Sequence, residues 1–195
     1  FPTRRSSDLK SDEEHPENGW CAHTQSTPFG WTAPGWDFYW GWSTAAVAWL
    51  MQNIYEHFEF TGDKEYFAEH IYPIMRESVR FYTQWLIYDD KQKRLVSSPT
   101  YSPEHGPVTI GNTYEQSLIE QLYNDFITAS EELGTDEELR NIVKNQVVQL
   151  KPYSVSKKTG LLKEWFEEDD DNFDHSKTQK NHRHISHLSF QRTTY

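Results

Sequence analysis

Apolar residues recur three and four positions apart in several stretches of the chain, which is the spacing of one face of an α-helix. Ser43 is a good N-cap for the first stretch, a helix predicted to run to about Phe60. The Thr-Gly-Asp sequence at 61–63 should end this helix and cap a short one over about residues 64–70. The residues predicted to face inward on the first helix are Ala46, Trp49, Leu50, Ile54 and His57.

The same spacing continues in three further stretches. A third helix after Pro73 carries Met75, Val79, Tyr82 and Leu86 on one stripe. A fourth is predicted over about 113–133, and a turn at 134–136 leads into a fifth over about 137–150. The residues predicted to face inward on these two helices are Leu118, Ile119, Leu122, Phe126 and Ala129, then Leu139, Ile142, Val143 and Val147.

The stretches between the helices are long and rich in Pro, Gly and aromatic residues at 15–43 and 88–112, and residues 151–195 are predicted to be mostly loop. Leu95–Ser97 is the only short strand that the pattern suggests. The chain is therefore predicted to be all-α, with helix pairs joined by short turns on one side and long loops on the other. An α/α toroid has this construction. A plain helical bundle or an α-solenoid is the alternative, and the lack of a repeat at a fixed period counts against the solenoid.

Composition supports a folded protein and narrows its partners. Aromatic residues make up 15% of the 195 residues, whereas disordered chains avoid them. Flat rings can stack on sugars, although most of these rings should simply be core. The net charge of −11 argues against nucleic acid and anionic membrane as partners. No apolar run approaches membrane-spanning length, and the single Cys21 leaves the compartment undecided, so localisation stays unknown.

Residues 1–10 have no periodicity, and we interpret them as a non-native leader. Residues 11–195 are then predicted to be an internal fragment of a longer protein. The ending at 189–195 also lacks capping or turn logic.

Glu104 is the first candidate for chemistry. It lies in the sequence Ser-Pro-Thr-Tyr-Ser-Pro-Glu-His-Gly at 98–106, on a loop between two long predicted helices. A carboxylate directly after proline has a locally stiff backbone, which suits a group that must hold its position against a substrate. A solvated loop glutamate is the alternative.

A second candidate is the segment at 182–188, which contains His182, Arg183, His184 and His187. These side chains could be metal ligands, a polar wall that binds sugar hydroxyls, or a solvated turn. The histidine spacings of two and three do not match the i, i+4 spacing of helical metal sites. We therefore favour substrate binding by these four residues over a metal site.

A third candidate is the pair Glu164 and Trp165, which precedes an acidic run from Glu167 to Asp171. Here a tryptophan could be a platform for a sugar ring, with carboxylates accepting from its hydroxyls. A tryptophan that anchors an acidic surface loop is an equal alternative. A calcium loop of the EF-hand type is disfavoured, because its spaced ligands and its glycine are missing.

Taken in order, several segments resemble glycoside hydrolase family 95, the inverting α-L-fucosidases. They are Ala48-Trp49-Leu50, Tyr55-Glu56-His57-Phe58, Phe60-Thr61-Gly62-Asp63, Tyr72-Pro73-Ile74, Ser102-Pro103-Glu104, Lys163-Glu164-Trp165 and His182 to Leu188. The resemblance implies an (α/α)6 barrel, of which this chain would be about the middle half. It also implies that Glu104 is the general acid, and that no metal and no cofactor are needed, since inverting glycosidases work through carboxylates.

The family's other catalytic motifs are not found in this sequence. An Asn-x-Asn motif, which holds the attacking water, would lie before residue 10, and the Asp of a Phe-Gln-Ile-Asp-Gly-Asn motif would lie beyond Tyr195. The chain also departs from the family pattern at His105, and at Glu115, where the family tends to have Asp. An inverting glycosidase needs both an acid and a base, so we expect this chain alone to be inactive.

The function implied by the resemblance is hydrolysis of terminal, α-1,2-linked L-fucose from an oligosaccharide or glycan. Two other classes stay open: another (α/α)6 sugar enzyme, such as an α-L-galactosidase or an inverting phosphorylase, and a non-catalytic carbohydrate-binding helical domain. Substitution of the general acid separates the last class from the enzymes, because it should lower turnover only in an enzyme.

Overall fold

A computed structural model describes residues 19–22, 43–102, 106–171 and 173, together with the backbone of two paired short strands, β1 (Gln25–Ser26) and β2 (Thr32–Ala33). The helices are α2 (Ala46–Thr61), α3 (Lys64–Tyr66), which continues as the π-helical turn η2 (Phe67–Ile71), α4 (Tyr72–Trp85), α5 (Thr113–Leu133) and α6 (Glu137–Val147). Between α4 and α5 lies an antiparallel hairpin of β3 (Leu86–Asp89) and β4 (Arg94–Ser97), in which Leu86 pairs with Ser97 and Asp89 with Arg94.

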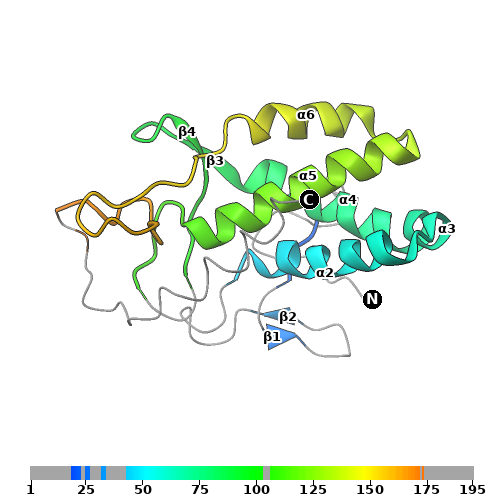
Figure 1. Cartoon of the computed structure of the whole chain (residues 1–195), viewed down its shortest axis with the longest axis horizontal. Helices are drawn as coiled ribbons and strands as arrows, with labels where there is room; N and C mark the ends of the chain where they lie inside the picture. Colours follow the sequence, from blue (N-terminus) through cyan, green and yellow to red (C-terminus); the bar gives the residue numbers. More distant parts are fainter. Residues whose placement is uncertain are drawn as a thin grey trace.

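The long helices run side by side, and the loops collect at one end of them (Figure 1). The turns from α2 to α3 and from α5 to α6 lie at the right of the view, where Gly62 and Gly134 end their helices in the left-handed conformation. The β3–β4 hairpin and the segment 151–171 lie at the opposite end. The predicted segregation of short turns and long loops is therefore confirmed for the described part of the chain.

The core lies between α2, α4 and α5. The predicted stripe of α4 is confirmed for Met75, Val79 and Tyr82, which are fully buried, whereas Leu86 is buried as the first residue of β3 rather than in the helix. All five residues predicted to face inward on α5 are buried as well. The core residues contributed by α2 are Val47, Ala48, Met51 and Tyr55.

The predicted inward face of α2 is wrong. Trp49 and Leu50 are 43% and 52% exposed, and His57 is exposed too, while Ala46 and Ile54 are half-buried. Apolar residues surround the helix almost completely between residues 45 and 51, so periodicity alone leaves its rotation open. Aromatic packing selects the other face: the Tyr55 ring lies 5.9 Å from that of Phe67, edge to face.

Two further expectations differ at the loop end. Residues 88–97 belong in part to the hairpin rather than to one irregular stretch, so the predicted strand Leu95–Ser97 is confirmed and has a partner that was missed. Helix α6 stops at Val147, three residues earlier than predicted, because residues 149–151 run beside β4. The Leu95 amide donates to the Gln149 carbonyl at 2.9 Å, and the Lys151 amide donates to the Leu95 carbonyl at 3.0 Å. Ile142 on α6, predicted to be inward, is 44% exposed.

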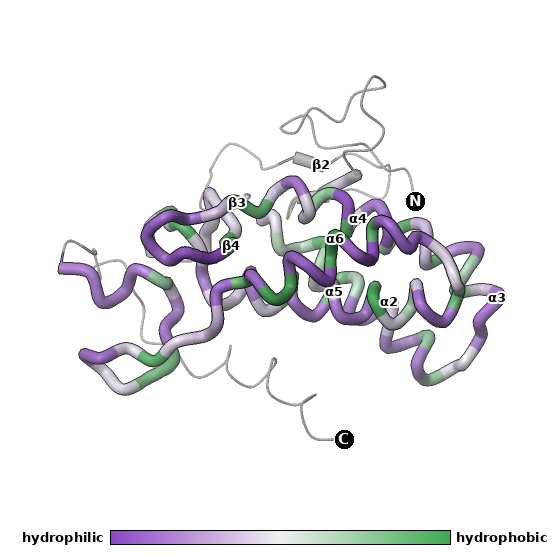
Figure 2. The backbone as a smooth tube through the Cα atoms, turned by 90° about the horizontal axis from the view of Figure 1, so that it is seen from above, coloured by the Kyte–Doolittle hydropathy of each residue, from purple (hydrophilic) through white to green (hydrophobic). Residues whose placement is uncertain are grey.

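The connection between β3 and β4 is hydrophilic, as the purple turn in Figure 2 shows. The Asp89 carboxylate accepts from the backbone amides of Lys91 at 3.2 Å and Gln92 at 3.0 Å, and the Asp89 carbonyl accepts from the Lys93 amide at 2.7 Å. Asp89 thus organises the turn by the local bonding that makes aspartate common in turns.

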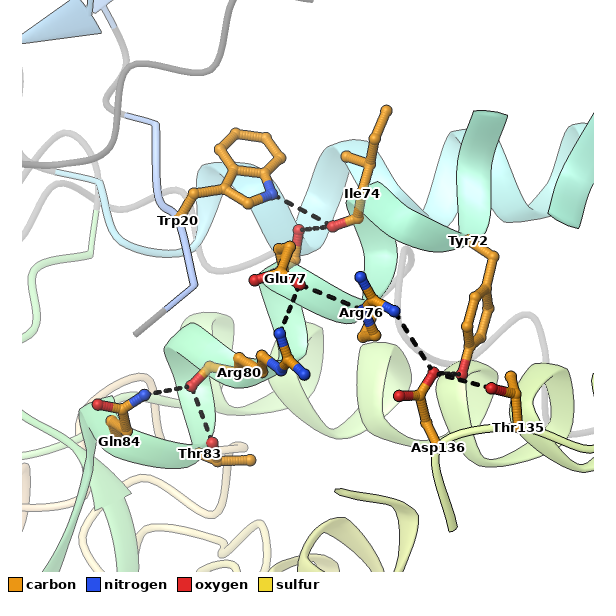
Figure 3. A network of polar contacts seen from close by, with 11 residues as sticks. Trp20, Tyr72, Ile74, Arg76, Glu77, Arg80, Thr83, Gln84, Thr135 and Asp136 are labelled. Carbon is orange, nitrogen blue, oxygen red and sulfur yellow. Dashed lines mark hydrogen bonds and ion pairs between the residues drawn. The ribbon is translucent and has the colours of Figure 1, made fainter. Parts of the chain in front are cut away.

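Polar contacts fix α4 to segments distant in the sequence (Figure 3). The Trp20 indole nitrogen donates to the Ile74 carbonyl at 3.2 Å, which ties residues 19–22 to α4. On the other side, the Tyr72 hydroxyl donates to the Asp136 carboxylate at 2.8 Å, and Arg76 lies 4.0 Å from the same carboxylate. Asp136 is the N-cap residue of α6, but its carboxylate makes no cap bond and contacts Tyr72 and Arg76 of α4 instead. Among the described residues, no helix is long and apolar enough to cross a membrane.

Candidate functional site

The loop between β4 and α5 is closed at its base by backbone pairing. The Thr100 amide donates to the Thr109 carbonyl at 3.0 Å, and the Thr109 amide donates to the Thr100 carbonyl at 2.9 Å. Inside this base, Tyr101, Ser102 and Gly106 are buried. Glu104, with its neighbours at 103 and 105, lies outside the described residues. The chain is therefore anchored directly before and directly after the candidate acid.

The segment 163–168 forms the support of this loop. Its backbone is joined to the start of α5, because the Thr113 amide donates to the Glu164 carbonyl at 2.9 Å and the Thr113 hydroxyl to the Lys163 carbonyl at 2.6 Å. The Ser102 hydroxyl donates to the Glu164 carboxylate at 2.5 Å in a buried contact. On the far side of the candidate acid, Gly106 lies against the fully buried indole of Trp165. Both anchors of the loop thus end on adjacent residues, 164 and 165.

Gly106 is required at this place for two reasons. Its φ of +84° is a conformation that other residues rarely adopt, and a Cβ atom there would lie 2.3 Å from the Trp165 ring. We expect Gly106→Ala to lower the free energy of unfolding by about 1–3 kcal/mol more than Gly160→Ala does, as measured by urea unfolding. Gly160 is the matched control, since its φ is +73° and nothing lies within 4 Å of the position of a Cβ atom. Equal losses in the two variants would show that the Trp165 contact does not constrain the loop.

A second buried carboxylate, Glu115, lies at the base of the same loop. It is only 2% exposed, and its two oxygens accept from the hydroxyls of Thr44 and Thr100. Asn112 completes the cluster: its amide nitrogen donates to the Thr100 hydroxyl at 2.8 Å, and its amide oxygen accepts from the Glu115 backbone amide at 2.7 Å. Burial raises the pKa of Glu115 to about 7, although the hydrogen bonds from Thr100 and Thr44 oppose the rise.

Two carboxylates of the acidic run at 167–171 stabilise the segment in which they lie. Asp169 accepts from the Ser156 hydroxyl at 2.6 Å and from the Lys157 amide at 3.0 Å, and it pairs with Lys163 at 2.8 Å. These contacts, led by that of Lys163, lower the pKa of the Asp169 carboxyl. Glu168 is buried and accepts from the Glu164 amide at 2.9 Å. The run is thus bonded to the segment that supports the loop.

The sequence-predicted site residues fall into two groups. Glu164 and Trp165 are described and lie directly behind the loop, 7% and 0% exposed. Their observed contacts are with the chain itself, so direct binding of substrate by these two residues stays a prediction. Glu104 and the four residues of the His-rich segment, His182, Arg183, His184 and His187, lie outside the described residues. Among the residues that are described, no group of three or more His, Cys, Asp or Glu side chains could hold a metal.

Sequence reasoning missed the role of Glu115. Asn112 is the N-cap of α5 and Glu115 is three residues later, which in sequence is typical of a capping box on a helix surface. Only half of that motif forms, because the Glu115 side chain turns into the core to meet Thr44 and Thr100. The hydroxyls at alternate positions, Thr100 and Ser102, gave no separate signal, since serine and threonine are common in any loop.

Comparison with known proteins adds an independent line of evidence. Residues 5–190 match the model of the glycosyl hydrolase family 95 catalytic domain. The chain is 32% identical over 182 residues to "Alpha-L-fucosidase 2" of Arabidopsis thaliana, which covers 88% of this chain and 21% of that protein. It is 30% identical over 177 residues to "Probable alpha-fucosidase A" of Aspergillus niger, which covers 87% of this chain and 22% of that protein.

The chain thus spans about a fifth of the length of these curated relatives. The family model covers nearly all of the chain, including the loop at 97–112 and its support at 163–168. This chain therefore belongs to glycosyl hydrolase family 95 and represents part of its catalytic domain.

Proposed function

We propose that the protein containing this chain hydrolyses terminal α-L-fucosidic bonds, with α-1,2 linkages in oligosaccharides as its substrates, and that Glu104 is the general acid. The observation that carries this proposal is the loop of Glu104, which is held by buried contacts on both sides in a chain of family 95. The names of the relatives, both α-fucosidases, support the choice of sugar.

The proposed chemistry is a single displacement. The proton of the Glu104 carboxyl passes to the glycosidic oxygen as the bond from that oxygen to the anomeric carbon breaks. A water attacks the anomeric carbon from the opposite face and gives its proton to a carboxylate, so that α-L-fucoside yields β-L-fucose. In inverting glycosidases the two carboxyl groups stand roughly 6.5–9.5 Å apart to leave room for the water.

We further propose that the helices described here are part of an (α/α)6 barrel, and that the base and the residues holding the water lie outside this chain. The side chains at 182–187 would bind the sugar hydroxyls, because imidazole and guanidinium groups are directional donors. Glu164 and Trp165 would complete that site from behind the loop. The exposed Trp49 and Leu50 on α2 support the barrel, since large apolar side chains at a helix surface commonly mark a face that another element covers.

The test is to follow hydrolysis of 2′-fucosyllactose by NMR, with the full-length protein and with this chain of 195 residues. We expect the full-length protein to release β-L-fucose first, and the isolated chain to show no measurable turnover. Release of the α-anomer would refute inversion, and a strict need for phosphate would show a phosphorylase instead. Preference for an α-L-galactoside would change the assigned sugar. Turnover by the isolated chain would show that the base lies within it.

A further inference from the structure

The carboxylate of Glu115 joins three parts of the chain that are distant in sequence. One oxygen accepts from Thr44, which lies just before α2, and the other accepts from Thr100 at the base of the loop, while Glu115 itself is in the first turn of α5. A fourth element, α4, reaches the cluster through Tyr82, whose hydroxyl donates to the Thr44 carbonyl at 2.5 Å and accepts from the Ala48 amide at 3.2 Å. Glu115 is thus the shared acceptor of a buried network.

Burying a carboxylate to hold a fold together is unfavourable by itself. Removing it from water costs free energy, and here that cost is visible in the raised pKa of Glu115. The carboxylate in turn fixes the positions of its neighbours, because it accepts from two hydroxyl donors in fixed directions. Without it, each hydroxyl would be buried without its acceptor. Such an arrangement is expected where a neighbouring segment must be held in one position.

That neighbouring segment is the loop of the candidate acid. Thr100 and Ser102 are alternate residues, and both direct their hydroxyls to buried carboxylates, Thr100 to Glu115 and Ser102 to Glu164. Glu104 follows two residues later. Successive hydroxyls therefore fix both the register and the direction of the chain as it approaches Glu104. Catalytic groups must be held within about 0.5 Å of the productive geometry, which requires such support.

We propose that Glu115 is a positioning residue for general acid catalysis: through Thr100 it holds the loop that carries Glu104, without contacting the substrate itself. This inference rests on the proposed role of Glu104. It assigns the residue a part in protonation of the leaving group rather than in binding the sugar.

The diagnostic experiment uses two substrates of the full-length protein that differ in their need for an acid. The leaving alcohol of 2′-fucosyllactose needs a proton, whereas fluoride leaves α-L-fucosyl fluoride with little help from an acid. We expect Glu115→Gln to lower kcat on 2′-fucosyllactose by roughly 10- to 100-fold and on the fluoride by less than about threefold. Glutamine has nearly the same shape but lacks the second acceptor oxygen. A residue with a merely structural role would lower both rates by the same factor.

Three variants complete the design. Glu131→Gln is the matched control, being the same change on the same helix at an exposed position, and should leave both rates unchanged. Thr100→Val removes the loop-side hydroxyl and should reproduce the selective loss, so it decides the question if Glu115→Gln does not fold. In combination with Glu104→Gln, Glu115→Gln should cause little further loss, because residues that act through one another are not additive.

The outcomes separate the two proposals. If Glu104→Gln lowers both rates equally or neither of them, the assigned acid is wrong, and the proposed function fails together with this inference. If Glu104→Gln is selective while Glu115→Gln and Thr100→Val lower both rates equally or not at all, only the positioning role is refuted.

Discussion

Replacing Glu104 by Gln in the full-length protein is expected to lower kcat for 2′-fucosyllactose by about 10²-fold or more, with little change in KM. The amide has the shape of the acid but cannot give a proton to the departing oxygen, and general acids typically contribute a factor of roughly 10²–10⁴. A hundredfold loss corresponds to about 2.7 kcal/mol of transition-state stabilisation. Because protonation occurs only as the bond breaks, the loss should fall on kcat rather than on binding of the ground state.

The measurement is the steady-state rate of fucose release, with the Glu131→Gln variant beside it. Glu131 pairs with Lys144 at the surface at 2.5 Å and is half-exposed, so that variant should keep wild-type rates. Wild-type turnover in Glu104→Gln would remove the acid role from this loop. If instead the unmodified full-length protein binds fucosylated glycans and shows no turnover, the chain belongs to a carbohydrate-binding domain.

Helix α5 shows how much of the fold can be predicted from the sequence. Its bounds, 113 and 133, agree with the prediction because both ends carry strong local signals. Asn112 accepts from the backbone amide of Glu115, and Gly134 adopts the left-handed conformation that ends a helix. Its five inward residues were also correct, since they recur three and four positions apart, although the fully buried Tyr123 was not among them.

The hairpin β3–β4 shows where prediction failed. Leu86 continues the helical spacing of α4 and was assigned to its stripe, while residues 88 and 89 were assigned to an irregular stretch, so the strand Leu86–Asp89 was missed. What decides in favour of a strand is pairing with residues 94–97 and the bonds of the Asp89 turn, which are contacts between separate residues rather than a period. Short apolar stretches are ambiguous between helix and strand for this reason.

The candidate site was only partly predictable for a similar reason. Glu104, Glu164 and Trp165 stand in recognisable motifs, so they could be singled out from the sequence. Glu115 could not, because its importance depends on burial and on partners 15 and 71 residues away. A charged residue in the first turn of a helix is ordinarily solvated and favourable to the helix dipole, which is the opposite of its environment here.

The raised pKa of Glu115 predicts how the stability of the chain depends on pH. Its pKa is about 7 in the folded protein and 4.5 ordinarily, so the folded state holds its proton more tightly than the unfolded state does. The stability associated with this proton is therefore fully present below about pH 4.5 and is lost as the pH rises through 7. The difference of 2.5 pKa units corresponds to about 3 kcal/mol. The titratable groups near Glu115, namely Tyr82, Tyr114 and through Tyr82 also Cys21, add no positive charge that would oppose this loss.

We therefore expect wild-type protein to lose about 2.5 kcal/mol of unfolding free energy between pH 5 and pH 8 relative to Glu115→Gln, whose amide does not titrate. Urea unfolding of both proteins at the two pH values measures this difference, and subtracting the variant removes the contributions of all other groups. Glu131→Gln should keep the pH dependence of the wild type, because the surface pair with Lys144 lowers the pKa of Glu131 and so makes it ionised throughout this range. Identical pH dependence in wild type and Glu115→Gln would mean that Glu115 is already ionised in the folded protein at pH 5. The hydroxyls of Thr44 and Thr100 would then outweigh the burial of the carboxylate.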